Sequence, residues 1–314
     1  MPDSTPFSLR GIYPPLVTPL THRDNDLQLD VESLGRLVEH TIAGGVAGLF
    51  ALGTTGETPS LPLRLKRAMV KETCRLAAGR VPVLVGVTDT CLEVSLELAE
   101  VAKDHGAACV VAAPPFYYPV NQQELLGYYR SLVEALPLPL LLYNIPSCTK
   151  TALAVDTVAQ LADHPNIIGI KDSSRDWDYF SELLKAVGGR DDFSVLIGPE
   201  ILLARAVQAG AVGGICGGSN MYPPLYVELF EAASARDAQR VAELQAVVER
   251  IGETIYTVSD SCARLIQGLK AALANLDICE TTMAPPLSPL DEDGCRQVAD
   301  YVAALGITAN ESGS

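Results

Sequence analysis

The sequence predicts an α/β protein that folds as a (β/α)₈ TIM barrel with an appended C-terminal helical region. Two observations carry this prediction. Eight apolar runs alternate with segments of helical periodicity across residues 11–234, and the connections between them are mostly short. The runs are nearly continuous in apolar residues, which is typical of strands that a parallel sheet buries on both faces. A doubly wound sheet is the alternative, but no GxGxxG motif follows the first run.

Each expected strand is a short run of aliphatic residues that ends near Gly, Pro or a polar residue. In chain order, the expected strands cover residues 11–19, 46–52, 81–87, 108–113, 138–143, 167–171, 193–197 and 212–216.

Each expected helix carries apolar residues three and four positions apart. The first begins at the N-cap residue Asp30 and stops at Gly44-Gly45. The next helices are expected at residues 60–78, 92–105, 122–135, 155–162, 177–187 and 201–209. The pattern indicates a barrel over residues 8–234, a helical extension over residues 235–308 with an interruption at Ala284-Pro285-Pro286, and a disordered tail over residues 309–314.

The composition excludes several classes of partner. The 314-residue chain has a formal net charge of −15, which disfavours nucleic acid and anionic membranes. No run of 18 apolar residues exists to span a bilayer, and the polar residues 1–10 do not resemble a signal peptide. The eight cysteines form no CxxC pair, as expected for reduced thiols in the cytoplasm.

Metal and cofactor chemistry is not expected. The histidines end no predicted strand and form no HxH or HExxH motif; they are His22, His40, His105 and His164. The same placement argues against a Ser/His/Asp catalytic arrangement.

Lys171 ends the sixth expected strand, Ile167 to Lys171. A lysine on an apolar strand is costly unless it is neutral or partnered. A neutral amine is a nucleophile that can attack a ketone and form a Schiff base. Two plainer interpretations remain: Lys171 reaches the surface from the strand end, or it forms an ion pair with Asp172.

Other polar residues follow the ends of neighbouring expected strands, where the active site of such a barrel lies. Gly53-Thr54-Thr55-Gly56 offers N–H groups and hydroxyls that could hold a carboxylate, although it could also be only a tight turn. Tyr117 and Tyr143 could move protons during Schiff-base formation or serve packing. Glycines around the eighth strand could cradle a phosphate or allow close packing; they are Gly213, Gly214, Gly217 and Gly218. Together, these residues indicate capture of a 2-keto acid.

Three motifs resemble those of the dihydrodipicolinate synthase/N-acetylneuraminate lyase family. They are Gly53-Thr54-Thr55-Gly56-Glu57, Tyr143-Asn144-Ile145-Pro146 and Gly169-Ile170-Lys171-Asp172-Ser173-Ser174, and the resemblance covers residues 8–305. It implies a class I, pyruvate-binding barrel without a cofactor, assembled as a homotetramer (a dimer of dimers).

The resemblance also implies roles for individual residues. Lys171 would form the Schiff base, Tyr143 would relay protons, and Gly53, Thr54 and Thr55 would hold the pyruvate carboxylate. In the synthase branch a tyrosine from a neighbouring subunit completes a Thr–Tyr–Tyr proton relay; Tyr117 aligns with this tyrosine and Thr54 with the threonine. Ile215 aligns with the residue whose backbone carbonyl faces the substrate.

Two departures from the family pattern concern specificity. The synthase branch has an arginine where this chain has Cys148, and a thiol cannot replace a bidentate guanidinium. Of the Asp-Glu pair of the sialic-acid branch, only Glu200 is left.

We therefore expect a class I lyase or aldolase that joins pyruvate, or another 2-keto acid, to a small aldehyde, or cleaves such a bond. Its substrate would be of the 2-keto-3-deoxy sugar acid type. A dehydratase acting through the same Schiff base, a 4-hydroxy-tetrahydrodipicolinate synthase and a non-catalytic 2-keto-acid sensor are the alternatives.

Overall fold

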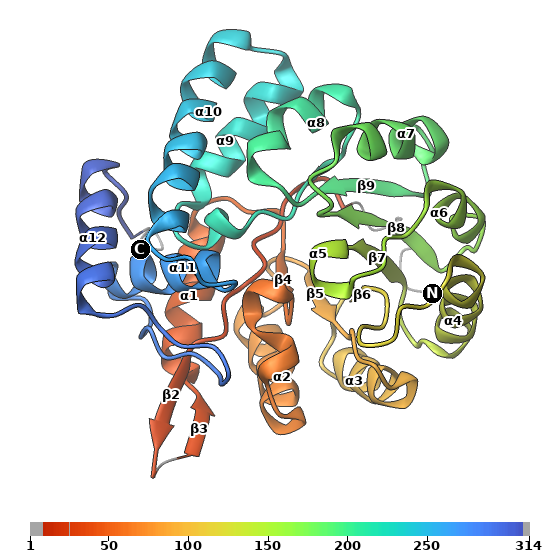
Figure 1. The fold of residues 1–314 in the computed structure, drawn as a ribbon, viewed down its shortest axis with the longest axis horizontal. Coiled ribbons are helices and arrows are strands. Elements are labelled where there is room, and N and C mark those ends of the chain that lie inside the picture. The colour runs from red at the N-terminus through yellow and green to blue at the C-terminus, as the bar shows by residue number, and fades with distance from the viewer. Residues whose placement is uncertain (1–8, 25, 310–314) are drawn as a thin grey trace.

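The computed structural model describes residues 9–24 and 26–309, and these residues form the predicted barrel (Figure 1). Parallel strands alternate with helices along the chain, and neighbouring strands in the sheet are paired in parallel register. The strands of this sheet are β1 (Gly11–Ile12), β4 (Leu49–Ala51), β5 (Val83–Gly86), β6 (Cys109–Ala112), β7 (Leu140–Asn144), β8 (Ile167–Asp172), β9 (Ser194–Ile197) and β10 (Gly213–Gly214).

The segment that begins with β1 closes the barrel. Gly11 and Ile12 pair with β10, and Pro15 makes a parallel bridge to Phe50 of β4. The N–H of Leu16 donates to the carbonyl of Phe50 at 2.9 Å. The predicted strand over residues 11–19 is therefore interrupted at its prolines, which have no N–H for a continuous ladder.

Helices follow the strands and cover the outside of the sheet. They are α1 (Val31–Ala43), α2 (Leu63–Ala77), α3 (Leu92–Asp104), α4 (Gln122–Ala135), α6 (Val155–Leu161), α7 (Trp177–Val187), α8 (Leu203–Ala209) and α9 (Pro223–Ala235), with a short α5 (Pro146–Thr149) after β7. The predicted N-cap is confirmed, because the Asp30 side chain accepts a hydrogen bond from the N–H of Ser33 at 3.1 Å.

Short 3₁₀ turns lie in several of the connections between elements. They are η1 (Thr54–Gly56), η2 (Thr58–Ser60), η3 (Glu200–Leu202), η4 (Gly217–Asn220) and η5 (Ile255–Thr257). The first four lie beyond the carboxyl ends of β4, β9 and β10, so they shape the end of the barrel where the candidate site residues gather.

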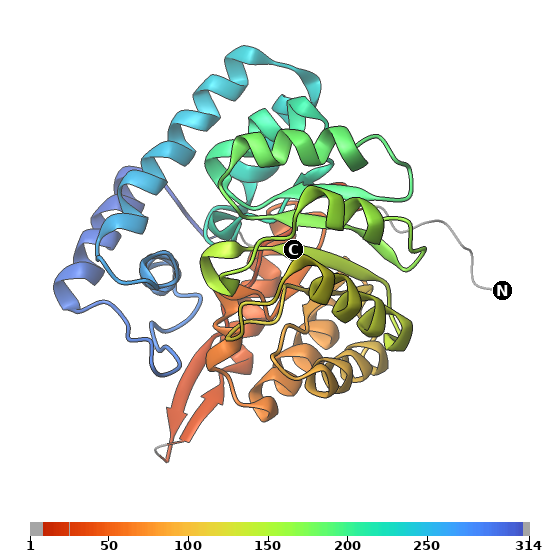
Figure 2. The ribbon, with the colours of Figure 1, turned by 45° about the vertical axis from the view of Figure 1, so that its right-hand side comes forward.

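One element has no counterpart in the sequence prediction. β2 (Leu20–Arg23) and β3 (Asp26–Leu29) form an antiparallel hairpin that projects from the barrel (Figures 1 and 2). Both strands are short, and their tips are polar and exposed. They therefore lack the apolar run or clean alternation by which a strand is recognised.

The predicted C-terminal helices follow the barrel as α10 (Ala238–Glu253), α11 (Arg264–Asn275) and α12 (Glu292–Ala304). Both ribbon views show them along one side of the barrel (Figures 1 and 2). The division at residues 234/235 stays a prediction, and the predicted tail falls outside the described residues from residue 310 onward. Within the described residues, no helix combines the length and apolarity that crossing a bilayer requires.

The buried apolar residues form an outer and an inner cluster. The outer cluster lies between the sheet and its helices and includes Leu49, Val110 and Ile170. The inner cluster fills the barrel and includes Phe50 and Tyr143. Successive strand residues point to opposite clusters, which sets the direction of every side chain at the strand ends.

Candidate active site

Lys171 lies inside the barrel, at the carboxyl end of β8. It pairs with Tyr143 of β7 on one side and with Leu196 of β9 on the other, and it is only 4% exposed. Its Nζ lies 4.3 Å from the ring centroid of Tyr143 and 5.3 Å from that of Phe50. The interpretation of a lysine that reaches the surface is therefore wrong.

Asp172 points the opposite way and does not pair with Lys171. Its carboxylate accepts hydrogen bonds from Asn144 Nδ2 at 2.8 Å and Ser174 Oγ at 2.9 Å. Burial raises the pKa of Asp172, and these two hydrogen bonds oppose that rise. The carboxylate thus joins the ends of β7 and β8, the strands that carry Tyr143 and Lys171.

A glycine allows β8 to lie close to β9 just before Lys171. A Cβ at Gly169 would stand 2.2 Å from the carbonyl oxygen of Ser194, which is closer than any side chain can approach. The β7–β8 register also shifts between Leu140 and Leu141, opposite this part of β8. Gly169 therefore allows β8 to lie against β9, and the shifted β7–β8 register places Lys171 beside Tyr143.

The Gly53-Thr54-Thr55-Gly56 segment lies beside Tyr143. Thr54 Oγ1 is 3.3 Å from the Tyr143 hydroxyl, and either group could be the donor. The N–H of Gly56 and the Thr58 hydroxyl both donate to the carbonyl of Gly53, at 3.0 and 2.9 Å. These bonds hold the η1 turn and leave its N–H groups at the N-terminal end, where helix donors have no partner within the turn.

A cavity of about 690 Å³ opens at this end of the barrel. Its lining includes most of the predicted site residues: Thr54, Thr55, Tyr143, Lys171, Glu200 and Ile215. The volume lies within the range of about 300–1,000 Å³ for small-molecule sites and leaves room beside a three-carbon acid.

Three predicted site residues do not line this cavity: Gly53, Tyr117 and Cys148. Tyr117 is 84% exposed, and its ring packs edge-on against that of the neighbouring Tyr118, with centroids 5.2 Å apart. Cys148 is exposed on α5, where its sulfur lies 3.9 Å from the Ser147 hydroxyl. The roles of these three residues, like those of the residues that line the cavity, stay predictions.

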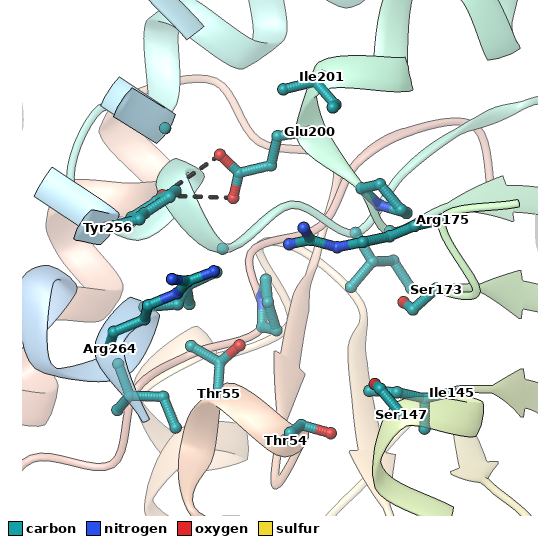
Figure 3. Close-up of a pocket in the computed structure, with 18 of the residues that line it drawn as sticks. Thr54, Thr55, Ile145, Ser147, Ser173, Arg175, Glu200, Ile201, Tyr256 and Arg264 are labelled. Atoms are coloured by element: carbon teal, nitrogen blue, oxygen red, sulfur yellow. Dashed lines mark hydrogen bonds between the residues drawn. The ribbon is translucent and has the colours of Figure 1, made fainter. Parts of the chain in front are cut away.

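Glu200 lines the cavity, but its carboxylate is already occupied by groups of the protein. It accepts hydrogen bonds from the Tyr226 hydroxyl at 2.5 Å, the Gly218 N–H at 2.7 Å and the Tyr256 hydroxyl at 3.2 Å (Figure 3). Burial raises the pKa of Glu200, and the Tyr226 hydrogen bond is the largest opposing influence. A Cβ at Gly218 would lie 2.0 Å from the Tyr226 oxygen, so this glycine allows close packing, as one of its two interpretations predicted.

The sequence prediction missed several residues that line the cavity. They include Ser147 and Ser173, and also Arg175 and Arg264, whose side chains extend into the space from opposite sides (Figure 3). Arg175 follows Lys171 by only four positions, which could have marked it. Arg264 comes from the C-terminal helices, and no local pattern connects it to the barrel.

The described residues contain no cluster of His, Cys, Asp or Glu arranged to hold a metal ion. The reactive groups that the cavity brings together include the Lys171 amine and the hydroxyls of Tyr143 and Thr54.

Comparisons with known proteins place these features in context. The sequence model of the Dihydrodipicolinate synthetase family matches residues 8–305. The 4-hydroxy-tetrahydrodipicolinate synthase of Thermus thermophilus is 36% identical over 301 residues, which cover 94% of this chain and 97% of that protein.

Two solved structures have the same fold. Dihydrodipicolinate synthase from Bacteroides thetaiotaomicron has 47% sequence identity and a TM-score of 0.90, with 94% of this chain and 98% of that chain covered. YagE from Escherichia coli K12, solved in complex with pyruvate, has 30% identity and a TM-score of 0.89, with 95% and 99% covered.

Proposed function

Because the chain belongs to the dihydrodipicolinate synthetase family, we propose that it is a class I lyase that binds pyruvate or another 2-keto acid as a Schiff base on Lys171. It then makes or cleaves a carbon–carbon bond between the bound keto acid and a small aldehyde. The observation that carries the proposal is the buried Lys171 amine, 4.3 Å from the Tyr143 ring in a cavity that also holds Thr54.

The residues can perform each step of the chemistry. The Lys171 amine adds to the ketone carbon of the keto acid, and loss of water from the carbinolamine gives the iminium. Removal of a proton from C3 gives an enamine, whose C3 attacks the aldehyde carbon while the aldehyde oxygen takes up a proton. Water then releases the product and regenerates the amine.

Tyr143 and Thr54 are proposed to carry the protons of these steps. Their hydroxyl oxygens are 3.3 Å apart, and Tyr143 lies beside Lys171. A proton can therefore pass between groups bound at Lys171 and the Thr54 hydroxyl by way of Tyr143. The Thr54-Thr55 end of the turn is proposed to hold the keto-acid carboxylate through N–H groups and hydroxyls. A carboxylate held there would place its neighbouring ketone toward Lys171.

Tyr117 is proposed to act in a neighbouring subunit of a homotetramer. Its exposed aromatic ring and its φ of +93°, which is unusual for a residue with a bulky side chain, support a role outside its own chain. The eight free cysteines suit a reducing compartment such as the cytoplasm.

The aldehyde partner is proposed to come from a 2-keto-3-deoxy sugar acid. Cys148 supports this choice over aspartate semialdehyde, since no guanidinium stands at that position. A 4-hydroxy-tetrahydrodipicolinate synthase is the second candidate, favoured by the name of the Thermus thermophilus relative. Consumption of pyruvate with aspartate semialdehyde, compared with consumption with sugar aldehydes, separates the two.

The test of the Schiff base is reductive trapping. The protein is incubated with pyruvate and borohydride, its intact mass is measured, and the modified peptide is mapped. We expect one reduced pyruvyl group per chain, on Lys171. Lys171→Ala should abolish the adduct, and the exposed Lys185→Ala should retain it.

An adduct on another lysine, or none on folded protein, would contradict the proposal. A protein that forms the adduct but turns over no aldehyde or sugar acid would be a keto-acid sensor instead.

A further inference from the structure

Two arginines face each other across the cavity. Arg175 lies in the loop between β8 and α7, and Arg264 is the first residue of α11, so they come from distant parts of the chain. Figure 3 shows both side chains extending into the space from opposite sides, with Glu200 above them and Thr55 below. Within the described residues, neither guanidinium forms an ion pair or a side-chain hydrogen bond. Two positive charges that face each other in this way repel unless an anion lies between them.

None of the carboxylates that line the cavity provides the anion between Arg175 and Arg264. Glu200 interacts with Arg175 by longer-range electrostatic attraction. Its carboxylate oxygens already accept hydrogen bonds from Tyr226, Tyr256 and the Gly218 N–H. Glu249 and Glu253 lie on exposed positions of α10, and neither pairs with an arginine of the cavity. The space between Arg175 and Arg264 is therefore open to an anion from solution.

We propose that Arg175 and Arg264 form an anion-binding subsite for the acceptor, so that the aldehyde partner carries a carboxylate or phosphate at the end remote from its carbonyl. This inference rests on the proposed function, because it assumes that a keto acid occupies Lys171. The planar guanidinium groups match both kinds of oxyanion in bidentate geometry. They supply the positive charge that Cys148 cannot.

The proposal narrows the class of substrate. A neutral sugar aldehyde would leave both guanidinium groups unpaired, whereas a sugar aldehyde that ends in a phosphate or a carboxylate would pair them. The cleavage substrate would then be a 2-keto acid with a second anionic group at its far end. The volume of about 690 Å³ is large enough for such a molecule.

The backbone of Arg175 allows a clean test. Its φ is +63°, a conformation that favours glycine, so Arg175→Gly removes the guanidinium without imposing strain. Arg236 offers a matched control: it has a φ of +58°, is exposed at the C-cap of α9, and does not line the cavity. Arg264→Gln removes the other charge and keeps good helix propensity at the start of α11.

The experiment measures borohydride trapping of Lys171 as a function of keto-acid concentration. Two probes, 2-oxoglutarate and 2-oxoadipate, carry a carboxylate at the end remote from the ketone. Their neutral matches are 2-oxo acids of the same carbon number that end in a methyl group. A further probe has the length of 2-oxoadipate and ends in a phosphonate. Each half-saturating concentration is divided by that of pyruvate for the same variant. The wild-type protein should prefer an anionic probe to its neutral match by about 10- to 100-fold.

Arg175→Gly and Arg264→Gln should each reduce this preference to about threefold or less, and Arg236→Gly should keep it. The better of the carboxylate and phosphonate probes identifies the anion. A wild-type protein without preference at either length, or a preference that both variants keep, would overturn the inference. Failure of pyruvate itself to form the adduct would reject the proposed function, and the subsite with it.

Discussion

Lys270 Nζ lies 2.5 Å from Oε1 of Glu57, and both side chains are fully buried. Lys270 Nζ also donates to the carbonyl of Thr282 at 2.5 Å, and Glu57 Oε2 accepts from the N–H of Ala284 at 2.7 Å. Glu57 is the C-cap of the η1 turn, with a φ of +58°. The pair therefore ties the turn that carries Thr54 to α11 and the segment after it.

Lys270→Met should destabilise the protein by about 3–5 kcal/mol, because it leaves the Glu57 carboxylate buried without its charged partner. It should also weaken pyruvate binding, because the turn loses its connection to α11. Urea denaturation gives the first quantity, and the concentration dependence of reductive trapping gives the second.

The surface pair of Lys71 and Glu72, 3.7 Å apart, provides the control for Lys270→Met. Lys71→Met should cost less than about 1 kcal/mol, because Lys71 is exposed and Glu72 keeps its pairing with Arg75. The double variant Lys270→Met, Glu57→Gln should be more stable than the sum of the single changes predicts. A cost below about 1 kcal/mol for Lys270→Met would mean that the buried pair does not hold the turn.

Tyr143→Phe should lower kcat by about 10²- to 10⁴-fold, because it removes the hydroxyl that is proposed to pass protons between the substrate and Thr54. The cost in stability should stay near 1 kcal/mol, since only one hydrogen bond of 3.3 Å is lost. Initial rates of pyruvate consumption and urea denaturation measure the two effects.

Tyr179→Phe is the control for Tyr143→Phe, because it removes a tyrosine hydroxyl that is not proposed to take part in the reaction. The Tyr179 hydroxyl donates to the carbonyl of Leu153 at 2.7 Å, so its loss should affect stability to a similar degree and leave kcat within about twofold. Equal losses of kcat in the two variants would remove Tyr143 from the proton relay.

Acid should destabilise the protein through His40. This side chain is 2% exposed, its Nε2 lies 3.2 Å from the carbonyl of Met221, and burial lowers its pKa. Since the unfolded chain takes up a proton near the ordinary pKa of about 6.5 and the folded chain does so only at lower pH, stability falls as the pH drops below that value. At pH values below the pKa of His40 in the folded protein, the contribution of His40 to stability stays at this reduced level.

Thermal midpoints at about pH 7.5 and about pH 5.5 check the His40 prediction. His40→Gln should make the difference between the two midpoints smaller, whereas the same change at the exposed His105 should leave it as in the wild type. A difference that His40→Gln does not alter would assign the acid sensitivity to other groups.

The sequence predicted the barrel and the centre of its site because both depend on local patterns. Continuous apolar runs mark buried parallel strands, and alternation along β8 puts Lys171 on the face opposite Ile170. The turn after β4 and the end of β7 meet Lys171 because the carboxyl ends of the barrel strands lie together. No long-range information was needed for these three elements.

The parts that were missed depend on contacts between distant segments. Lys270 pairs with Glu57, which is 213 positions earlier in the chain, only because α11 packs against the turn that carries Glu57. Arg264 reaches the cavity by the same packing. Side-chain burial and charge pairing of this kind follow from the tertiary arrangement, which periodicity does not encode.

Tyr117→Phe should lower kcat by about tenfold or more without changing the assembly, if its hydroxyl completes the relay of a neighbouring subunit. Tyr118→Phe, at the adjacent exposed aromatic, should leave kcat within about twofold. Sedimentation velocity and initial rates measure assembly and turnover on the same samples. A monomer in sedimentation velocity would contradict the homotetramer and this role of Tyr117 together.

Mixing two inactive variants tests directly whether Tyr117 acts across subunits. Lys171→Ala lacks the nucleophile, and Tyr117→Ala lacks the exposed hydroxyl. If each site takes Lys171 from one chain and Tyr117 from another, a mixed assembly contains some sites with both groups intact. Co-refolding the two variants should then restore turnover well above that of either alone, up to about one quarter of the wild-type rate for random pairing. If Tyr117 served its own chain, no mixed site would gain both groups, and the mixture would show only the average of its two components.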